Sequence, residues 1–188
     1  MRLIDECIIN FKAGNGGNGI VSWRREANVP MGGPYGGNGG DGGNVILIAD
    51  GNVNTLYEWN HRKTVEAPDG ENGRTAKETG HGGQDVYVNL PLGTSVYDAN
   101  TKILLVDLLE PGQTFTICTG GKGGRGNAFF KSANNRAPTL HENGDLGEDK
   151  TVLLRLKYIA DVGLVGLPNA GKSTLVGKIS SAKPKIGN

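Results

Sequence analysis

The chain has 188 residues, of which 36% are hydrophobic, and its formal net charge is +1. This hydrophobic content is sufficient to bury a core, so composition excludes an intrinsically disordered chain. Glycine accounts for 32 residues, but the glycine runs are short and only 8 prolines are present, which excludes collagen.

The two cysteines lie far apart, and there is no CxxC motif or His/Cys cluster. This pattern indicates two reduced core thiols, Cys7 and Cys118, in a cytoplasmic protein. The N-terminal apolar run contains Asp5 and Glu6 and therefore does not resemble a signal peptide. No apolar run approaches the ~18 residues of a membrane span. We therefore expect a cytoplasmic protein with no membrane span.

Short strands separated by turns dominate the first 158 residues. Alternation over residues 3–12 places Cys7, Ile9 and Phe11 on one face. Further strands are predicted at residues 20–25, 45–49, 61–67, 86–90, 94–97, 102–108, 114–118 and 151–158, and residues 68–83 are predicted to form a projecting loop. About eight short strands of this kind indicate a mainly β fold with a β-sandwich or jelly-roll base.

Three glycine runs repeat with a period of three residues. They occupy residues 14–19, 32–43 and 120–126, and in the second run the period begins at Tyr35. This period matches the polyproline II helix, which has three residues per turn and no internal hydrogen bonds. Several such helices can bond to one another because glycine lets their backbones approach closely. We expect a bundle projecting from the β base; the alternative is a flexible linker.

The same runs also spell GxGxxG, the dinucleotide-binding pattern. It appears at Gly14, Gly16 and Gly19 and recurs in the other two runs. Any repeat of two glycines and one other residue generates this pattern, and no copy is followed by a convincing helix. Since the motif requires a strand, a turn and a helix, we reject a dinucleotide site.

Composition changes near residue 158. Residues 1–150 carry a net charge of −4, residues 151–188 carry +5, and 27 of the 32 glycines lie before residue 151. We therefore expect a glycine-rich domain at 1–158 and, at 159–188, the first strand, phosphate loop and helix of a truncated α/β domain.

A phosphate-binding loop is predicted in this second segment. Residues 166–173 read GLPNAGKS, which fits GxxxxGKS, between an apolar run at 159–165 and a helix predicted at 172–181. The nucleotide-binding candidates are Gly166, Leu167, Pro168, Asn169, Ala170, Gly171, Lys172, Ser173 and Thr174. A glycine turn that happens to carry a lysine would leave the Gly-Lys-Ser order unexplained.

The chemistry of such a loop assigns roles to these residues. Gly166 and Gly171 permit the turns that point amides at a phosphate, and the helix N-terminus attracts the anion. Lys172 would bridge the β- and γ-phosphates, and the Ser173 hydroxyl would coordinate magnesium. No DxxG or NKxD motif follows, so the chain itself offers no catalytic residue and does not reveal the base. We expect this fragment to bind nucleotide weakly and not to turn over.

The whole chain resembles the Obg family of bacterial GTPases. The resemblance is carried by the segments 12–19, 21–26, 32–43, 120–127, 136–138, 144–148 and 160–166, the last of which leads into the phosphate loop. The family usually has Phe at the position of Leu167, a departure that leaves the phosphate cradle intact.

The resemblance implies the Obg fold, a glycine-rich domain on a β base, followed by a Ras-like GTPase domain. It further implies Mg²⁺ with GTP and GDP, slow hydrolysis, rapid exchange, and action in assembly of the large ribosomal subunit and in growth and stress control. Implied partners are GTP and GDP, the large subunit with its rRNA, and the stringent-response nucleotide; we expect a monomer.

A basic stretch at residues 119–138 is a candidate RNA-contact region. It carries Lys122, Arg125, Lys131 and Arg136 with two phenylalanines between them, and Arg24 and Arg25 could add to it. The alternative is a solvated basic loop with two core phenylalanines. The family's glycine-rich domain is thought to enter ribosomal RNA, which favours the RNA-facing interpretation.

Three functions remain open on the residues alone. The first is a GTPase whose N-terminal domain docks on the ribosome, and the second is a non-enzymatic RNA-binding module with a vestigial phosphate loop. The third is an ATP-using enzyme of the same loop class, because the loop does not separate the two nucleotides. We favour the GTPase for the parent protein.

Overall fold

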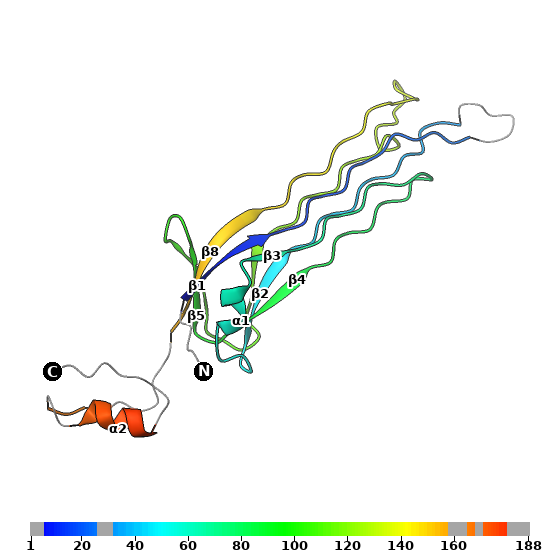
Figure 1. Ribbon diagram of the computed structural model, residues 1–188. Coiled ribbons are helices and arrows are strands. Elements are labelled where there is room, and N and C mark those ends of the chain that lie inside the picture. The colour runs from blue at the N-terminus through cyan, green and yellow to red at the C-terminus, as the bar shows by residue number, and fades with distance from the viewer. Residues whose placement is uncertain (1–5, 26–31, 158–164, 168–170, 180–188) are drawn as a thin grey trace.

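The computed structural model describes residues 6–25, 32–157, 165–167 and 171–179. Its base is built from two β-sheets (Figure 1). The larger sheet has the strand order β3 (Thr64–Glu66), β1 (Glu6–Lys12), β8 (Asp149–Leu156), β5 (Thr94–Asp98), β6 (Leu104–Leu108). The smaller sheet has the order β4 (Val86–Pro91), β2 (Val45–Asp50), β7 (Thr114–Cys118). The predicted mainly β base is thus confirmed.

Both sheets are mixed in direction. β1 pairs with β8 in antiparallel fashion over seven residue pairs, from Glu6↔Arg155 to Lys12↔Asp149, and with β3 in parallel. In the smaller sheet, β2 is parallel to β4 and antiparallel to β7. Because β1 leads directly into the glycine run at 14–19 and β2 directly follows the run at 32–43, the sheet order fixes where those runs meet the base.

The core lies between the sheets and follows from residue alternation. Ile9 and Phe11 of β1, Leu47 of β2 and Leu154 of β8 are fully buried, whereas Ile8 is exposed. Cys7 and Cys118 are buried and not disulfide-bonded, as predicted, and burial raises the pKa of each thiol to about 11. These thiols therefore contribute packing rather than reactivity.

Long extended segments leave one end of the base and run side by side (Figure 1). We call them the arms; they comprise residues 13–19, 37–44, 68–73, 79–85, 119–126 and 139–148. None is a helix or strand, and each bonds to its neighbours through backbone amides, with N···O distances of 2.8 Å for Gly17 to Gly40 and for Gly39 to Gly124. The predicted bundle is confirmed as a set of extended, mutually hydrogen-bonded glycine-rich segments, and the flexible-linker interpretation is wrong.

Glycine is required in the arms because neighbouring backbones occupy the space of a side chain. A Cβ at Gly17 would lie 2.0 Å from the Glu71 carbonyl oxygen, and one at Gly42 would lie 2.0 Å from that of Gly14. The remaining residue of each triplet is often Asn or Asp, whose side chain accepts an amide of the next arm. Asn38, Asp41 and Asn44 accept the amides of Gly126, Gly123 and Gly120, with N···O distances of 2.8–2.9 Å.

Several predicted elements differ from the structure. Residues 20–25 do not form a strand; Trp23 makes a single bridge to Pro34, because this stretch lies beyond the end of the arms, away from both sheets. The strand predicted at 61–67 is confirmed in part, because β3 occupies Thr64–Glu66; the helix α1 (Tyr57–His61) that ends at the first residue of this range was not predicted. The predicted loop at 68–83 consists of two arms, and residues 139–148 form an arm that was not predicted.

The second segment is described only in part. Helix α2 (Lys172–Ile179) begins where the phosphate-loop pattern requires it. The strand predicted at 159–165 lies outside the described residues except for Val165, which is exposed coil. Over the ranges that the structure covers, no helix is long and apolar enough to cross a bilayer.

Candidate functional site

Gly171 lies in the phosphate-loop candidate, directly before helix α2. This residue has φ of +78°, a conformation that favours glycine, and its carbonyl accepts the amide of Leu175 at 2.9 Å in the first turn of α2. A Cβ at Gly171 would meet nothing within 4 Å, so conformation rather than space selects glycine. Pro168, Asn169 and Ala170, in the middle of the loop, lie outside the described residues.

Lys172 connects the helix to the start of the loop. Its ammonium donates hydrogen bonds to the carbonyl oxygens of Gly166 and Leu167, each with an N···O distance of 2.6 Å. The Lys172 side chain therefore points back towards the start of the loop. A phosphate in the loop would compete with the carbonyls for this cation, since charge-assisted bonds to phosphate are stronger than bonds to neutral oxygens.

Ser173 is the residue here whose chemistry fits magnesium. It lies in the first turn of α2, directly after Lys172, and its hydroxyl is a hard oxygen donor. Within the described part of the chain, no group of three or more His, Cys, Asp or Glu side chains could hold a metal ion.

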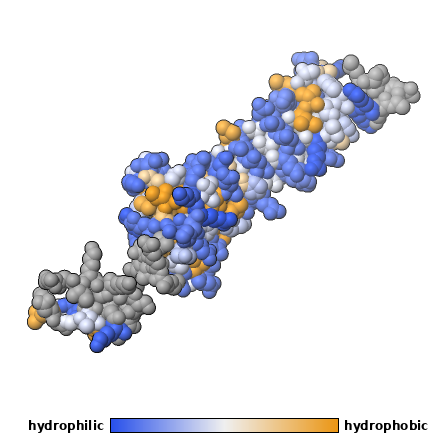
Figure 2. All heavy atoms as spheres, in the orientation of Figure 1, coloured by the Kyte–Doolittle hydropathy of each residue, from blue (hydrophilic) through white to orange (hydrophobic). Residues whose placement is uncertain are grey.

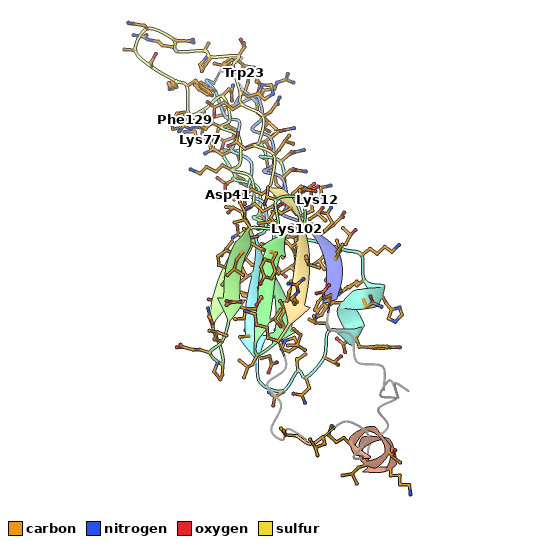
Figure 3. The ribbon with its side chains drawn as sticks, turned by 90° about the vertical axis from the view of Figure 1, so that its left-hand side faces the viewer. Lys12, Trp23, Asp41, Lys77, Lys102 and Phe129 are labelled. Atoms are coloured by element: carbon orange, nitrogen blue, oxygen red, sulfur yellow. The ribbon has the colours of Figure 1, made fainter. Side chains whose placement is uncertain are left out.

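The arms end in a second candidate site, far from the sheets. We call it the tip; it comprises residues 20–25, 32–36, 74–78 and 127–138. Figure 3 places Trp23, Lys77 and Phe129 at this end and Lys102 at the sheets. The Tyr35 amide donates to Ser22 and the Tyr35 carbonyl accepts from Lys77, so backbone hydrogen bonds hold the tip segments together.

A pair of aromatic side chains, one exposed and one partly buried, lies on the tip. Phe129 is 56% exposed, and its ring makes an edge contact with Phe130 at a centroid distance of 5.5 Å. The Arg125 guanidinium lies over the Phe129 ring at 4.3 Å, a cation–π geometry. The interpretation of both phenylalanines as core residues is therefore wrong for Phe129. Figure 2 shows hydrophobic atoms gathered near this end of otherwise hydrophilic arms.

All six basic candidates are exposed, but the structure separates them. Lys122 and Arg125 lie along an arm and line a groove shared with Glu142 and Asp145, and the Arg125–Glu142 ion pair has an N···O distance of 3.8 Å. Acidic neighbours therefore offset part of this positive charge. The arm at 139–148 supplies these acids, and its unrecognised glycine spacing at Gly144 and Gly147 was the signal in the sequence.

The other basic candidates lie within the tip itself. Arg24 lies 6.0 Å from the centroid of the Tyr35 ring, and the Lys131 ammonium approaches Gly33 on the neighbouring segment. Arg25 belongs to the segment of Arg24, and Arg136 to the exposed loop after Phe130. Sequence reasoning missed Lys77, which has φ of 61° at the turn between two arms and is also exposed.

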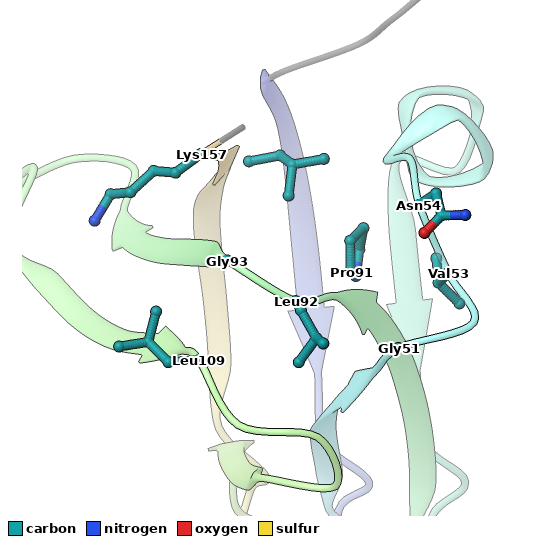
Figure 4. Close-up of a pocket in the computed structure, with 9 residues that line it drawn as sticks. Gly51, Val53, Asn54, Pro91, Leu92, Gly93, Leu109 and Lys157 are labelled. Carbon is teal, nitrogen blue, oxygen red and sulfur yellow. The ribbon is translucent and has the colours of Figure 1, made fainter. Parts of the chain in front are cut away.

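A cavity of about 450 Å³ lies at the opposite end of the base (Figure 4). Leu92, Leu109 and Leu156 contribute to its mainly apolar lining. Lys157 is its charged residue, and the Lys157 ammonium is 3.2 Å from the Asp107 carboxylate. Such a lining offers hydrophobic contact but no group placed for acid–base chemistry.

Comparison with known proteins finds one family and many relatives. A family model described as GTP1/OBG matches residues 4–158. Curated relatives named GTPase Obg are 56% identical over 188 residues in Mycoplasmoides gallisepticum, 54% over 186 in Malacoplasma penetrans and 50% over 186 in Persephonella marina. They align with 99–100% of this chain, whereas the chain spans only 43%, 43% and 55% of their lengths.

Proposed function

The chain belongs to the GTP1/OBG family, and from this premise we propose that its parent protein is a GTPase that binds GTP and GDP with magnesium and hydrolyses GTP slowly. The observation that carries the proposal is the GxxxxGKS sequence with Gly171 at positive φ directly before α2. The relatives carry the name GTPase Obg, which supports GTP over ATP.

In this proposal the loop from Gly166 to Thr174 binds the nucleotide phosphates. Lys172 leaves the two loop carbonyls and contacts the β- and γ-phosphates, while backbone amides at the start of α2 contact the phosphate oxygens. Magnesium bound at Ser173 would neutralise phosphate charge. No hydrolytic residue is proposed within this chain, so its 188 residues alone are expected not to turn over.

The test is nucleotide binding by the full-length parent and its Lys172→Ala variant. We expect the parent to bind GTP in preference to ATP and the variant to lose most of this affinity, because the cation facing the phosphates is gone. Lys178→Ala, an exposed lysine of the same helix, is the matched control and should bind normally. ATP binding as tight as GTP binding would contradict the GTP assignment.

We propose that the tip contacts ribosomal RNA of the large subunit during its assembly in the cytoplasm. Exposed Arg and Lys side chains provide phosphate contacts, and the exposed Phe129 ring beside Arg125 provides a stacking surface for an unpaired base. Lys131, Arg136, Arg24 and Arg25 lie within the tip itself, whereas Lys122 and Arg125 lie along an arm and share a groove with acids.

Charge reversal tests the proposed contact between the tip and ribosomal RNA. Arg24, Arg25, Lys131 and Arg136, the four basic candidates of the tip, are changed together to Glu, and sedimentation of the parent with large ribosomal subunits is measured. The control reverses four exposed basic residues of the base region: Lys12, Arg62, Lys63 and Lys102. We expect the tip variant to lose co-sedimentation and the control to keep it; unchanged sedimentation of the tip variant would remove the RNA proposal.

The alternative is a non-enzymatic RNA-binding module with a vestigial phosphate loop. Its supporting observation is that backbone hydrogen bonds between segments hold the arms and tip together and that the tip carries exposed basic side chains. It predicts that the Lys172→Ala parent assembles ribosomes normally, whereas the GTPase proposal predicts that assembly fails.

The GTPase proposal includes two further points that rest on the family alone. The parent protein is regulated by the stringent-response nucleotide, and it is a monomer.

A further inference from the structure

Five Asn-Gly pairs occur in the chain, and all five lie in the arms. They begin at Asn15, Asn18, Asn38, Asn72 and Asn143. Asn-Gly is the dipeptide in which a backbone amide most readily attacks an asparagine side chain, because glycine has no Cβ to obstruct the approach. The arms therefore concentrate a reactive sequence in a part of the molecule that depends on regular backbone spacing.

Four of the five asparagine side chains are held by a neighbouring arm. The side-chain oxygens of Asn15, Asn18 and Asn38 accept the amides of Gly147, Gly144 and Gly126 at 2.8–3.0 Å. The Asn72 oxygen accepts the amide of Asn18 at 2.8 Å. To react, each of these side chains must break its inter-arm bond and turn back towards its own backbone.

Asn143 differs from the other four. Its side chain is exposed at the groove beside Lys122 and Arg125, and it makes no hydrogen bond within the described part of the chain. The Gly144 amide donates to Asn18 at 2.9 Å, but the glycine amides of the other pairs are bonded as well, for example Gly16 to Asp145 and Gly39 to Gly124. The free side chain is thus the feature that sets this pair apart.

We propose that Asn143 is a site of spontaneous deamidation, and that the inter-arm hydrogen bonds protect the other four asparagines while the bundle is folded. The Gly144 nitrogen forms a bond to Cγ of Asn143, and the Cγ–Nδ2 bond breaks. The proton of the Gly144 amide leaves with the departing ammonia. Water then opens the cyclic imide at either carbonyl, giving aspartate or isoaspartate.

The isoaspartate product would disturb the packing of its arm. The flanking amides of Glu142 and Asp145 donate to the carbonyls of Arg125 and Lys122 at 2.9 and 2.8 Å. An isoaspartate at position 143 inserts a methylene into the main chain between these two bonds. The arm can then keep its register with residues 119–126 on only one side of the insertion. This inference does not depend on the proposed function.

Trypsin separates the relevant sites. Peptide 137–150 contains Asn143 as its single asparagine, peptide 64–74 contains Asn72, and peptide 13–24 contains Asn15 and Asn18. The 188-residue chain is incubated at mildly alkaline pH, with and without urea, and the acid form of each peptide is followed by mass spectrometry. We expect peptide 137–150 to convert several-fold faster than the other two in the folded chain, and all three to convert at similar rates in urea.

Equal rates in the folded chain would overturn the proposal, as would an intact Asn143 after the urea-treated sample has converted. The effect on packing is tested with Asn143→Gln, which forms the imide far more slowly. After ageing, the wild-type chain should exchange the amide hydrogens of residues 119–126 faster than this variant. Identical exchange in the two aged proteins would contradict the predicted loss of register.

Discussion

The side-chain oxygen of Asn127 accepts the amide of Gly36 at 2.9 Å, across 91 positions of sequence. The same side chain also accepts from the Ser22 amide and donates to the carbonyls of Ser22 and Pro138 at 3.1 Å each. Asn127 is fully buried. One asparagine therefore joins three separate segments where the arms meet the tip.

Asn127→Ala should destabilise the protein more than any exposed substitution in the tip. It leaves the Gly36 amide and the Pro138 carbonyl without their partner in a buried site, and we expect a loss of about 2–4 kcal/mol. The free energy of unfolding in urea measures this. The control is Asn134→Ala, at an exposed position of the same loop. Similar losses for the two variants would show that Asn127 does not hold the tip together.

The packing of the arms leads us to expect different effects on the thermal unfolding midpoint for two glycine-to-alanine changes. A Cβ at Gly17 would lie 2.0 Å from the Glu71 carbonyl oxygen, whereas one at Gly82 would approach only the Asp41 oxygen, at 3.5 Å. Gly17→Ala must push two arms apart and should lower the unfolding midpoint clearly, while Gly82→Ala should be close to neutral. Thermal unfolding of both variants decides this, and a neutral Gly17→Ala would contradict close packing of the arms.

The sequence predicts the arms where the period of three is unbroken. Residues 14–19 and 35–43 repeat without interruption, so their conformation could be inferred from spacing alone. The arm at 139–148 has only Gly144 and Gly147 in phase, and the acidic residues Glu142, Asp145 and Glu148 around them suggest an ordinary loop. Which arm lies beside which is set by the strand order of the base, and a pattern of three carries no information on that order.

Helix α1 and the acidic residues beside Lys122 and Arg125 also could not be predicted from sequence spacing, whereas the phosphate loop could. Five residues are too few to reveal a helical period, and Trp59 is fixed instead by its indole bond to the Asn89 carbonyl at 3.2 Å. The phosphate loop is recognisable because its residue order is dictated by chemistry. The acidic neighbours of Lys122 and Arg125 were not predictable, because they come from an arm that pairs with this one only in the folded bundle.

The Asn and Asp side chains that accept inter-arm amides should tolerate exchange for one another but not for apolar residues. Asn38 accepts the Gly126 amide at 2.8 Å through an oxygen that Asp also provides. Asn38→Asp should therefore change the free energy of unfolding little. Asn38→Leu leaves a partly buried amide unpaired and should cost about 1–3 kcal/mol. Urea unfolding compares the two, and equal losses would show that the acceptor oxygen does not matter.

Glu148, next to the first residue of β8, should make the free energy of unfolding depend on pH in the acidic range. Its carboxylate accepts the Thr119 amide at 2.8 Å and the Lys150 ammonium at 3.0 Å, and these bonds lower the pKa of Glu148 in the folded protein. Because the folded pKa is depressed, its stabilisation is complete above the unfolded pKa and is lost as the pH falls through the folded pKa.

Glu148→Gln isolates this contribution, since it keeps an acceptor oxygen but removes the charge. Asp98 and Asp107 also have lowered pKa values, owing to hydrogen bonds from Thr101 and Ser95 respectively, but they are present in both proteins and cancel in the comparison. We expect wild type to be more stable than the variant at neutral pH, and the difference to shrink as the pH falls below the ordinary glutamate value of 4.5. Urea midpoints measured across this range test the prediction; a difference that stays constant with pH would mean that the charge of Glu148 contributes nothing.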